Sequence, residues 1–266
     1  MKLRFPLRAY KTLDRLYLHY DKKMIRRTRN LALMPGLSQR QAPGRPSYGE
    51  WCYLVGIFQT VLRTNLKKDT DNDVLDVGCG TGIMAIASQP FLGEKGHYTG
   101  IDVKRSDIEF CRQHYPNKNF SFIHLDASNQ VFAPDQSAGK VKWEVADASA
   151  DVVTALSVWT HMNEDDAIFY FREIDRVLKP GGRVVVLEIT TPRKPPLSTF
   201  YSLWFDRIVP LIGRVTGENE AYTYLPNSVK RFPGPEGLAA AMERSGLRDI
   251  RWILTAGGII ALHVGT

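Results

Sequence analysis

Three glycines and a carboxylate lie close together in the stretch Asp73-Val-Leu-Asp-Val-Gly-Cys-Gly-Thr-Gly82. The apolar residues predict a strand, and Gly78, Gly80 and Gly82 let the backbone turn sharply beside a ligand. The loop opens a helix, whose free amides favour a carboxylate or another electronegative group. Asp76 suits a positively charged aminoacyl end better than a pyrophosphate. The third glycine also comes one residue too early for the GxGxxG pattern of dinucleotide-binding loops.

Two further carboxylates follow predicted strands. Asp102 ends Gly100-Ile-Asp, about 20 residues after the glycine loop, where a carboxylate can accept both hydroxyls of a ribose. Asp126 and Ala127 follow the next strand, where an acid or amide could bind the amino group of adenine. Carboxyl ends of neighbouring parallel strands meet at the rim where open sheets bind ligands. With the glycine loop, these acids predict one coherent cofactor site.

A histidine follows the fourth predicted strand, in Ala155-Leu-Ser-Val-Trp-Thr-His-Met162. His161, with a pKa near neutrality, could take a proton from a hydroxyl, an amine or an acidic carbon. The alternative is a loop histidine that caps or spaces the chain. Trp159 is either part of the core or a wall for a flat acceptor. The remaining histidines are dispersed and the three cysteines show no CxxC spacing, so we expect no metal and a reducing cytosol.

Short β-rich runs alternate with helical runs from Asp73 onward, which predicts an α/β fold with a doubly wound, seven-stranded, mostly parallel sheet. The strands are expected at 74–77, 97–102, 120–124, 151–156, 183–189, 250–254 and 259–264. Helices are expected at 48–66, 82–91, 105–115, 164–178, 199–212 and 234–246. Gly181-Gly182 is expected to cap the helix that ends near Leu178.

The connecting segments carry their own expectations. Pro35-Gly36, Pro43-Gly44 and Pro46 predict a loop. The stretch Ala127–Ala150 is long for a connection between strands, and we expect an excursion near the pocket or a small flap. The domain boundaries expected are 1–66 for an N-terminal helical extension and 67–266 for the catalytic domain, with 192–233 forming a cap over the substrate.

The charge of +7 is concentrated at the N-terminus, where residues 1–30 hold ten Lys or Arg and two Asp or Glu. Because the rest of the chain is nearly neutral, the sequence does not indicate a nucleic-acid-binding face. Residues from Phe5 to about Leu33 predict a basic amphipathic helix, which either packs on the domain, meets anionic lipid or gates the pocket. No apolar run is long enough to span a bilayer. We expect a cytoplasmic protein with peripheral membrane contact as an option, and a homodimer is left open.

The glycine loop and the acids resemble those of class I S-adenosylmethionine-dependent methyltransferases, as does Arg176-Val-Leu-Lys-Pro-Gly-Gly-Arg183. The resemblance implies a Rossmann-like domain that binds S-adenosylmethionine and releases S-adenosylhomocysteine. It also implies a role for each residue along the rim. The methionine part would be held by Asp76, Gly78, Cys79, Gly80, Thr81 and Gly82, the ribose by Asp102 and Val103, and the adenine by Asp126 and Ala127, with Ser157 as a further contact.

The C-terminal part, from about Lys179, resembles the ubiquinone/menaquinone-biosynthesis C-methyltransferase family. Its successive motifs are Gly182-Arg-Val-Val-Val-Leu-Glu-Ile-Thr-Thr-Pro192, Tyr222-Thr-Tyr-Leu-Pro-Asn-Ser-Val229 and Gly257-Gly-Ile-Ile-Ala-Leu-His-Val-Gly265. Those enzymes methylate a ring carbon of a polyprenylated quinol. The resemblance implies that Tyr222, Tyr224 and Ser228 line the acceptor pocket. Otherwise this stretch is a structural turn under the sheet.

One departure keeps the acceptor open. The family carries an Arg-Asn pair after the fourth strand, where this chain has Thr160 and His161. The leading hypothesis is carbon methylation of an aromatic, quinone-like or lipophilic small molecule, with His161 as the catalytic base. The second is O- or N-methylation of a soluble metabolite or natural product. A third, from another class, is a non-catalytic partner protein that binds the cofactor or has lost it.

Overall fold

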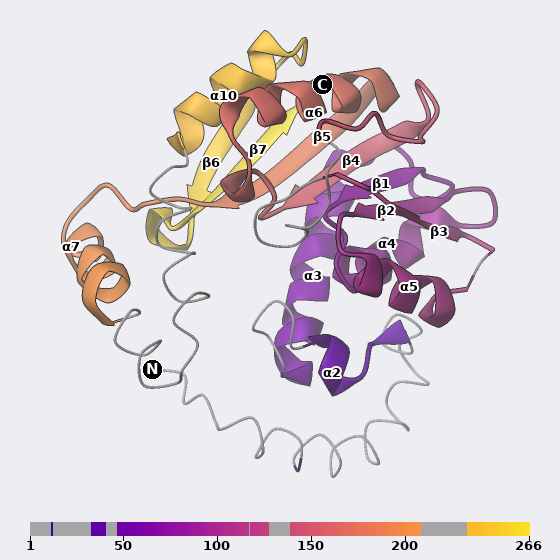
Figure 1. Cartoon of the computed structure of the whole chain (residues 1–266), viewed down its shortest axis with the longest axis horizontal. Coiled ribbons are helices and arrows are strands. Elements are labelled where there is room, and N and C mark those ends of the chain that lie inside the picture. Colours follow the sequence, from indigo (N-terminus) through magenta and orange to yellow (C-terminus); the bar gives the residue numbers. More distant parts are fainter. Residues whose placement is uncertain (1–11, 13–32, 41–46, 117, 128–138, 209–232) are drawn as a thin grey trace. The chain divides into compact units, whose positions relative to one another are not determined.

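The structure is a computed structural model, which describes residues 12, 33–40, 47–116, 118–127, 139–208 and 233–266 (Figure 1). The described chain divides into two compact units, residues 1–126 and 127–266. The strand order is β3-β2-β1 in the first unit and β4-β5-β7-β6 in the second. The predicted α/β class and the seven-stranded, mostly parallel sheet are confirmed.

The first unit has three parallel strands. They are β1 (Val74–Val77), β2 (Tyr98–Asp102) and β3 (Phe120–His124). All four residues of β1 are buried, as expected for a strand covered on both faces. In the register Val77 pairs with Ile101, and Asp102 pairs with His124, so the three carboxyl ends meet at one edge. Helices α4 (Ile83–Leu92) and α5 (Arg105–His114) both pack against β2.

Helix α3 (Tyr48–Asn65) begins at Ser47, whose side chain accepts a hydrogen bond from the amide of Glu50, 3.4 Å away. This is the arrangement expected of a helix N-cap. Its buried side chains recur every three or four residues and pack toward α4, and they are Trp51, Val55, Phe58 and Leu62. The predicted loop before it is partly wrong, because Leu37–Arg40 form a single helical turn, α2. The amide of Arg40 closes that turn on the carbonyl oxygen of Gly36.

The second unit contains β4 (Ala150–Leu156), β5 (Leu178–Ile189), β6 (Arg251–Thr255) and β7 (Ile260–Gly265). Strands β4 and β5 are parallel, and β7 pairs antiparallel with both β5 and β6. Helix α10 (Gly234–Arg244) packs against α6 (Glu164–Val177). Helix α7 (Leu197–Leu203) continues into a π-helical segment, Trp204–Ile208, so the helix predicted from Thr199 starts two residues earlier.

Gly181-Gly182 does not cap a helix, which corrects the expectation from the sequence. Helix α6 ends at Val177, and Leu178 is already extended and begins β5. The two glycines lie inside β5, opposite a register irregularity between Ala150 and Val152, and Gly181 has φ +72°. A bulge needs such a backbone, which glycine adopts without steric cost.

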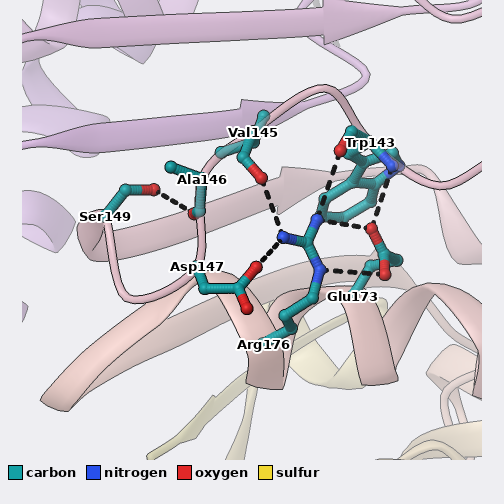
Figure 2. A network of polar contacts seen from close by, with 7 residues as sticks. All are labelled: Trp143, Val145, Ala146, Asp147, Ser149, Glu173 and Arg176. Carbon is teal, nitrogen blue, oxygen red and sulfur yellow. Dashed lines mark hydrogen bonds and ion pairs between the residues drawn. The ribbon is translucent and has the colours of Figure 1, made fainter.

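The second half of the long connection before β4 is fastened to α6 (Figure 2). The Arg176 guanidinium bonds the carboxylates of Glu173 and Asp147 and the carbonyl oxygens of Trp143 and Val145. The same Glu173 carboxylate accepts the amide of Trp143, 2.9 Å away. The Trp143 ring also stacks on Tyr170 of α6. The Arg176 guanidinium, with the carboxylates of Glu173 and Asp147, thus holds residues 143–147 on the surface of α6.

Among the described residues, no helix is long and apolar enough to cross a membrane. Several expectations fall wholly or partly outside the part of the chain that the structure describes. They are the basic helix over residues 5–33 apart from Thr12 and Leu33, the loop residues 43, 44 and 46, residues 128–138 of the excursion, and residues 209–232 of the expected cap.

Candidate active site

The glycine loop leaves β1 and folds back onto the end of β2. The carbonyl oxygen of Ile101 accepts hydrogen bonds from the amides of Gly78, at 2.8 Å, and of Cys79, at 3.1 Å. Gly78, Gly80 and Gly82 all have positive φ, which L side chains rarely adopt. Gly78 is exposed and Gly80 half-buried, so this part of the loop backbone is open to solvent. The sequence prediction of a sharp turn built on these glycines is therefore matched in the first unit.

Asp102 is tied into the loop by both of its carboxylate oxygens. Oδ2 accepts the amide of Gly80 and Oδ1 accepts the amide of Lys104, each at 2.8 Å. Burial raises the pKa of Asp102, and the two amides oppose that rise. Each carboxylate oxygen has a second lone pair, so the group can still accept two hydroxyl donors. A vicinal diol such as that of a ribose fits this requirement.

Asp76 lies deeper, with 2% of its surface exposed. The hydroxyl of Tyr98 donates a hydrogen bond to Asp76 Oδ2 over 2.7 Å. Burial is also the main reason why the pKa of Tyr98 is raised well above its ordinary value, so this hydroxyl stays a donor. A carboxylate held in this way at the end of β1 is a favourable partner for a cation.

Tyr115 closes the back of the glycine loop. Its hydroxyl donates to the carbonyl oxygens of Thr81 at 2.9 Å and of Gly82 at 3.0 Å. A Cβ on Gly82 would meet that hydroxyl at 2.5 Å, whereas a Cβ on Gly80 would meet nothing within 4 Å. The loop is therefore packed on one side and has open space at Gly80 on the other. This asymmetry fits a ligand that approaches the loop at Gly80.

The other predicted cofactor residues up to Ala127 differ in exposure. The hydroxyl of Thr81 donates to the carbonyl oxygen of Gln39 in α2, over 3.0 Å, so its side chain is engaged with that helix. Cys79 is buried, and Val103 is half-buried. Asp126 is exposed and Ala127 is buried, one residue apart beyond β3. An adenine role for Asp126 and Ala127 stays a prediction.

In the second unit, a turn at the carboxyl end of β4 carries the predicted base. The turn begins at Ser157, which has φ +55° and whose amide donates to Leu187 of β5 over 2.8 Å. It ends in a 3₁₀ turn, η2 (Trp159–His161). His161 is half-buried, and burial lowers the pKa of its imidazole. The ring is therefore mostly neutral at pH 7, the form that can accept a proton.

Trp159 is 2% exposed, and its ring lies 4.2 Å from that of Phe171 in α6. The indole nitrogen is buried without a hydrogen-bond partner among the described residues. This placement favours the core alternative for Trp159 over the acceptor wall. Tyr222, Tyr224 and Ser228 lie outside the described residues, so their acceptor role stays a prediction.

The sequence analysis did not identify Glu188, a residue of β5 whose carboxylate binds the backbone of this turn. Glu188 Oε1 accepts the amides of Val158 at 2.7 Å and of Trp159 at 2.8 Å. Its side chain is fully buried, and burial raises the pKa to about 7 although these amides and Thr160 oppose the shift. A single acid within the apolar run Val184-Val-Val-Leu-Glu-Ile189 was the one feature that could have revealed it. Tyr98 and Tyr115 were not identified either, because no comparable signal in the sequence marks them.

Comparisons with known protein sequences give the family of the chain, and solved structures share its fold. The ubiE/COQ5 methyltransferase family matches residues 57–266. A demethylmenaquinone methyltransferase of Staphylococcus aureus is 33% identical over 211 residues, covering 77% of this chain and 81% of that protein. An Aquifex aeolicus SAM-dependent methyltransferase has a similar fold, with TM-score 0.51 and 18% identity over 78% of this chain and 88% of that one. Phosphoethanolamine N-methyltransferase 2 of Haemonchus contortus, solved with S-adenosyl-L-methionine, matches with TM-score 0.50 and 16% identity over 75% and 38%.

Proposed function

The chain belongs to the ubiE/COQ5 methyltransferase family, and we propose that it methylates a ring carbon of a quinol-like, lipophilic acceptor. It is an S-adenosylmethionine-dependent methyltransferase. The observation that carries the choice of acceptor is the 33% identity to a demethylmenaquinone methyltransferase. The third hypothesis from the sequence, a non-catalytic partner, has no such support.

The first unit supports the proposed cofactor contacts. Asp102 retains a free lone pair on each oxygen for the ribose hydroxyls, after accepting Gly80 and Lys104. The open side of Gly80 leaves room for the methionine part, and Asp76 supplies negative charge for its ammonium group. When bound, S-adenosylmethionine supplies an electrophilic methyl group on a sulfonium.

The chemistry left to the protein is alignment and proton removal. We assign proton removal to His161, whose neutral imidazole accepts the proton of a ring hydroxyl of the quinol. The resulting oxyanion pushes electron density onto the adjacent ring carbon, which forms the new bond to the methyl group as the methyl–sulfur bond breaks and a neutral thioether leaves. The oxygen is then a carbonyl, and loss of the proton from the methylated carbon restores the aromatic ring and the oxyanion, which takes a proton back from the His161 imidazolium.

One observation favours a second candidate, the O- or N-methylation of a soluble metabolite. Thr160 and His161 stand where the family carries its Arg-Asn pair. A histidine base can equally deprotonate a hydroxyl that is itself methylated, so His161 is compatible with methylation of either carbon or oxygen. The position of the methyl group in the product distinguishes the two reactions.

The deciding experiment uses a matched pair of acceptors. The first is a short-chain 2-prenyl-1,4-naphthoquinol with a free ring carbon, and the second is the same quinol already methylated at that carbon. Carbon methylation predicts a product 14 Da heavier from the first acceptor only, with the methyl group located on carbon by NMR. Turnover of both would instead show O-methylation, and turnover of neither would contradict a quinol acceptor.

The surroundings of the enzyme are part of the proposal. We propose a cytoplasmic protein whose basic N-terminal stretch contacts anionic lipid, because residues 1–30 hold ten Lys or Arg and two Asp or Glu. Co-sedimentation with phosphatidylglycerol vesicles should then be lost when residues 1–30 are deleted. Binding that is unchanged by the deletion would remove this role. A homodimer stays a prediction, which sedimentation velocity can test.

A further inference from the structure

A fully buried carboxylate lies beneath the turn that carries His161. Glu188, on β5, holds the amides of Val158 and Trp159 on one oxygen, at 2.7 and 2.8 Å. Its other oxygen, Oε2, is buried without a hydrogen-bond partner among the described residues. Two consecutive residues of the turn are thus bound to one oxygen of a side chain that lies about 30 positions further along the chain.

The turn is not one that its own sequence favours. Ser157 has φ +55°, a left-handed conformation that costs a residue with a side chain free energy unless other contacts compensate. An isolated buried carboxylate is also unfavourable, and it becomes tolerable only when donors surround it. Each of these unfavourable features is partly relieved by the other, because the strained turn presents two amide donors to one oxygen of the acid.

The turn has a fixed side and a reactive side. On the fixed side, the Trp159 ring packs on Phe171 of α6. On the other, His161 follows directly, and its amide closes the turn on the carbonyl oxygen of Val158. We propose that Glu188 is a positioning residue for methyl transfer, which fixes the backbone at Val158 and Trp159 and so sets where His161 meets the acceptor. This role rests on the function proposed above.

The groups around Glu188 are mostly uncharged. Its side chain is fully buried, and its hydrogen-bond donors are the amides of Val158 and Trp159. On β7 its register partner is Ala261, and His263, two residues further on the same face, bonds the carbonyl oxygen of Pro235. His161 on the turn itself is the other titratable neighbour along the chain. The carboxylate therefore acts through hydrogen bonds to the turn, and no ion pair to it is found among the described residues.

The test compares three replacements of Glu188. Glu188→Leu removes both acceptor oxygens at similar volume, whereas Glu188→Gln keeps one oxygen for the Val158 and Trp159 amides. Glu188→Asp serves if the leucine variant does not fold, because it keeps the charge and is one CH₂ shorter. The control is Glu173→Leu, which removes another buried carboxylate that accepts a backbone amide, that of Trp143, away from the turn.

Two quantities are measured on the full-length variants. The first is amide hydrogen exchange of the peptide covering residues 157–163, with peptides from β1–β3 as an internal standard. The second is kcat and KM for the short-chain quinol and for S-adenosylmethionine. For Glu188→Leu we expect about tenfold faster exchange confined to the turn, and a kcat about 10- to 100-fold lower, since small displacements of reacting groups have such effects.

Glu188→Gln should recover most of the exchange protection and most of kcat, and Glu173→Leu should leave kcat within about twofold. The proposal is overturned if Glu188→Leu matches the wild type in both measurements, or if Glu173→Leu lowers kcat as much. A glutamine variant as impaired as the leucine variant would also contradict it. If the wild type methylates no quinol, the function proposed above fails, whereas the exchange comparison still tests what Glu188 holds.

Discussion

The amide of Gly80 donates a hydrogen bond to the carboxylate of Asp102 over 2.8 Å, although 22 residues separate them. The bond joins the glycine loop after β1 to the end of β2. The same carboxylate also accepts the amide of Lys104, so Asp102 orders two backbone segments and still presents free lone pairs. Loop shape and proposed ribose recognition therefore depend on a single side chain.

Replacing Asp102 by alanine should weaken S-adenosylhomocysteine binding by at least about 100-fold, because two charge-assisted hydrogen bonds to the ribose are lost. Isothermal titration calorimetry measures this, with Asp107→Ala as the control. Asp107 lies on the next helix and pairs with Lys104 near the surface. Wild-type affinity in Asp102→Ala would remove Asp102 from the cofactor site.

The two glycines of the loop should respond differently to alanine. In Gly82→Ala the new Cβ would lie 2.5 Å from the Tyr115 hydroxyl at φ +90°, so we expect a loss of roughly 2–4 kcal/mol in the free energy of unfolding. Gly80→Ala has φ +49° but open space, and should lose only about 1–2 kcal/mol while cofactor affinity falls. Urea unfolding and calorimetry separate the two effects. Equal stability losses would contradict the packed and open sides of the loop.

His161→Ala should lower kcat about 10²- to 10⁴-fold, the usual contribution of a general base. Burial lowers the pKa of His161. The wild-type rate should therefore stay constant as the pH falls through the ordinary histidine range and should decrease only at lower pH. The alanine variant should lose this acid limb. His97→Ala is the control, since that imidazole bonds Ser121 at the amino ends of β2 and β3 in the first unit. If His161→Ala has the wild-type rate at every pH, His161 is not the general base.

Glu188 predicts how stability depends on pH. Its pKa is about 7 in the folded protein, against 4.5 for an ordinary glutamate. A raised pKa means that the folded state binds the proton more tightly, so this contribution is present below pH 4.5 and is lost as pH rises through 7. The wild type should therefore gain up to about 3 kcal/mol relative to Glu188→Gln between pH 8 and pH 4.5. A difference independent of pH would contradict the buried, titrating acid.

Arg176 should matter for stability and not for catalysis. Its side chain is 17% exposed and neutralises Glu173, which is 10% exposed, so Arg176→Ala leaves a nearly buried carboxylate without its cation. We expect a loss of about 2–3 kcal/mol in the free energy of unfolding, allowing for partial solvation. Arg244→Ala breaks an exposed ion pair with Glu164 and should cost less than about 1 kcal/mol. Similar losses in both variants would refute the importance of burial.

Much of the fold was predictable because its determinants are local. The strand at Val74–Val77 and the helix from Tyr48 follow from apolar runs, spacing and caps that a few consecutive residues supply. The glycine loop was predictable for the same reason, since backbone conformation at Gly78, Gly80 and Gly82 depends on the absence of a side chain there. The exception was Gly181-Gly182, where the same residue type serves a bulge in β5. Which use applies depends on the neighbouring strand.

The tertiary structure decided the contacts between distant residues. The sequence placed Asp102 and the glycine loop at one rim, but only the fold shows that Gly80 and Lys104 occupy one lone pair on each of its oxygens. The sequence also named His161, yet the acid beneath its turn lies on another strand and was not found. Residue types and local spacing determine what chemistry is available. The hydrogen-bond partners of a buried group depend on which strands become neighbours, and a linear pattern does not contain that information.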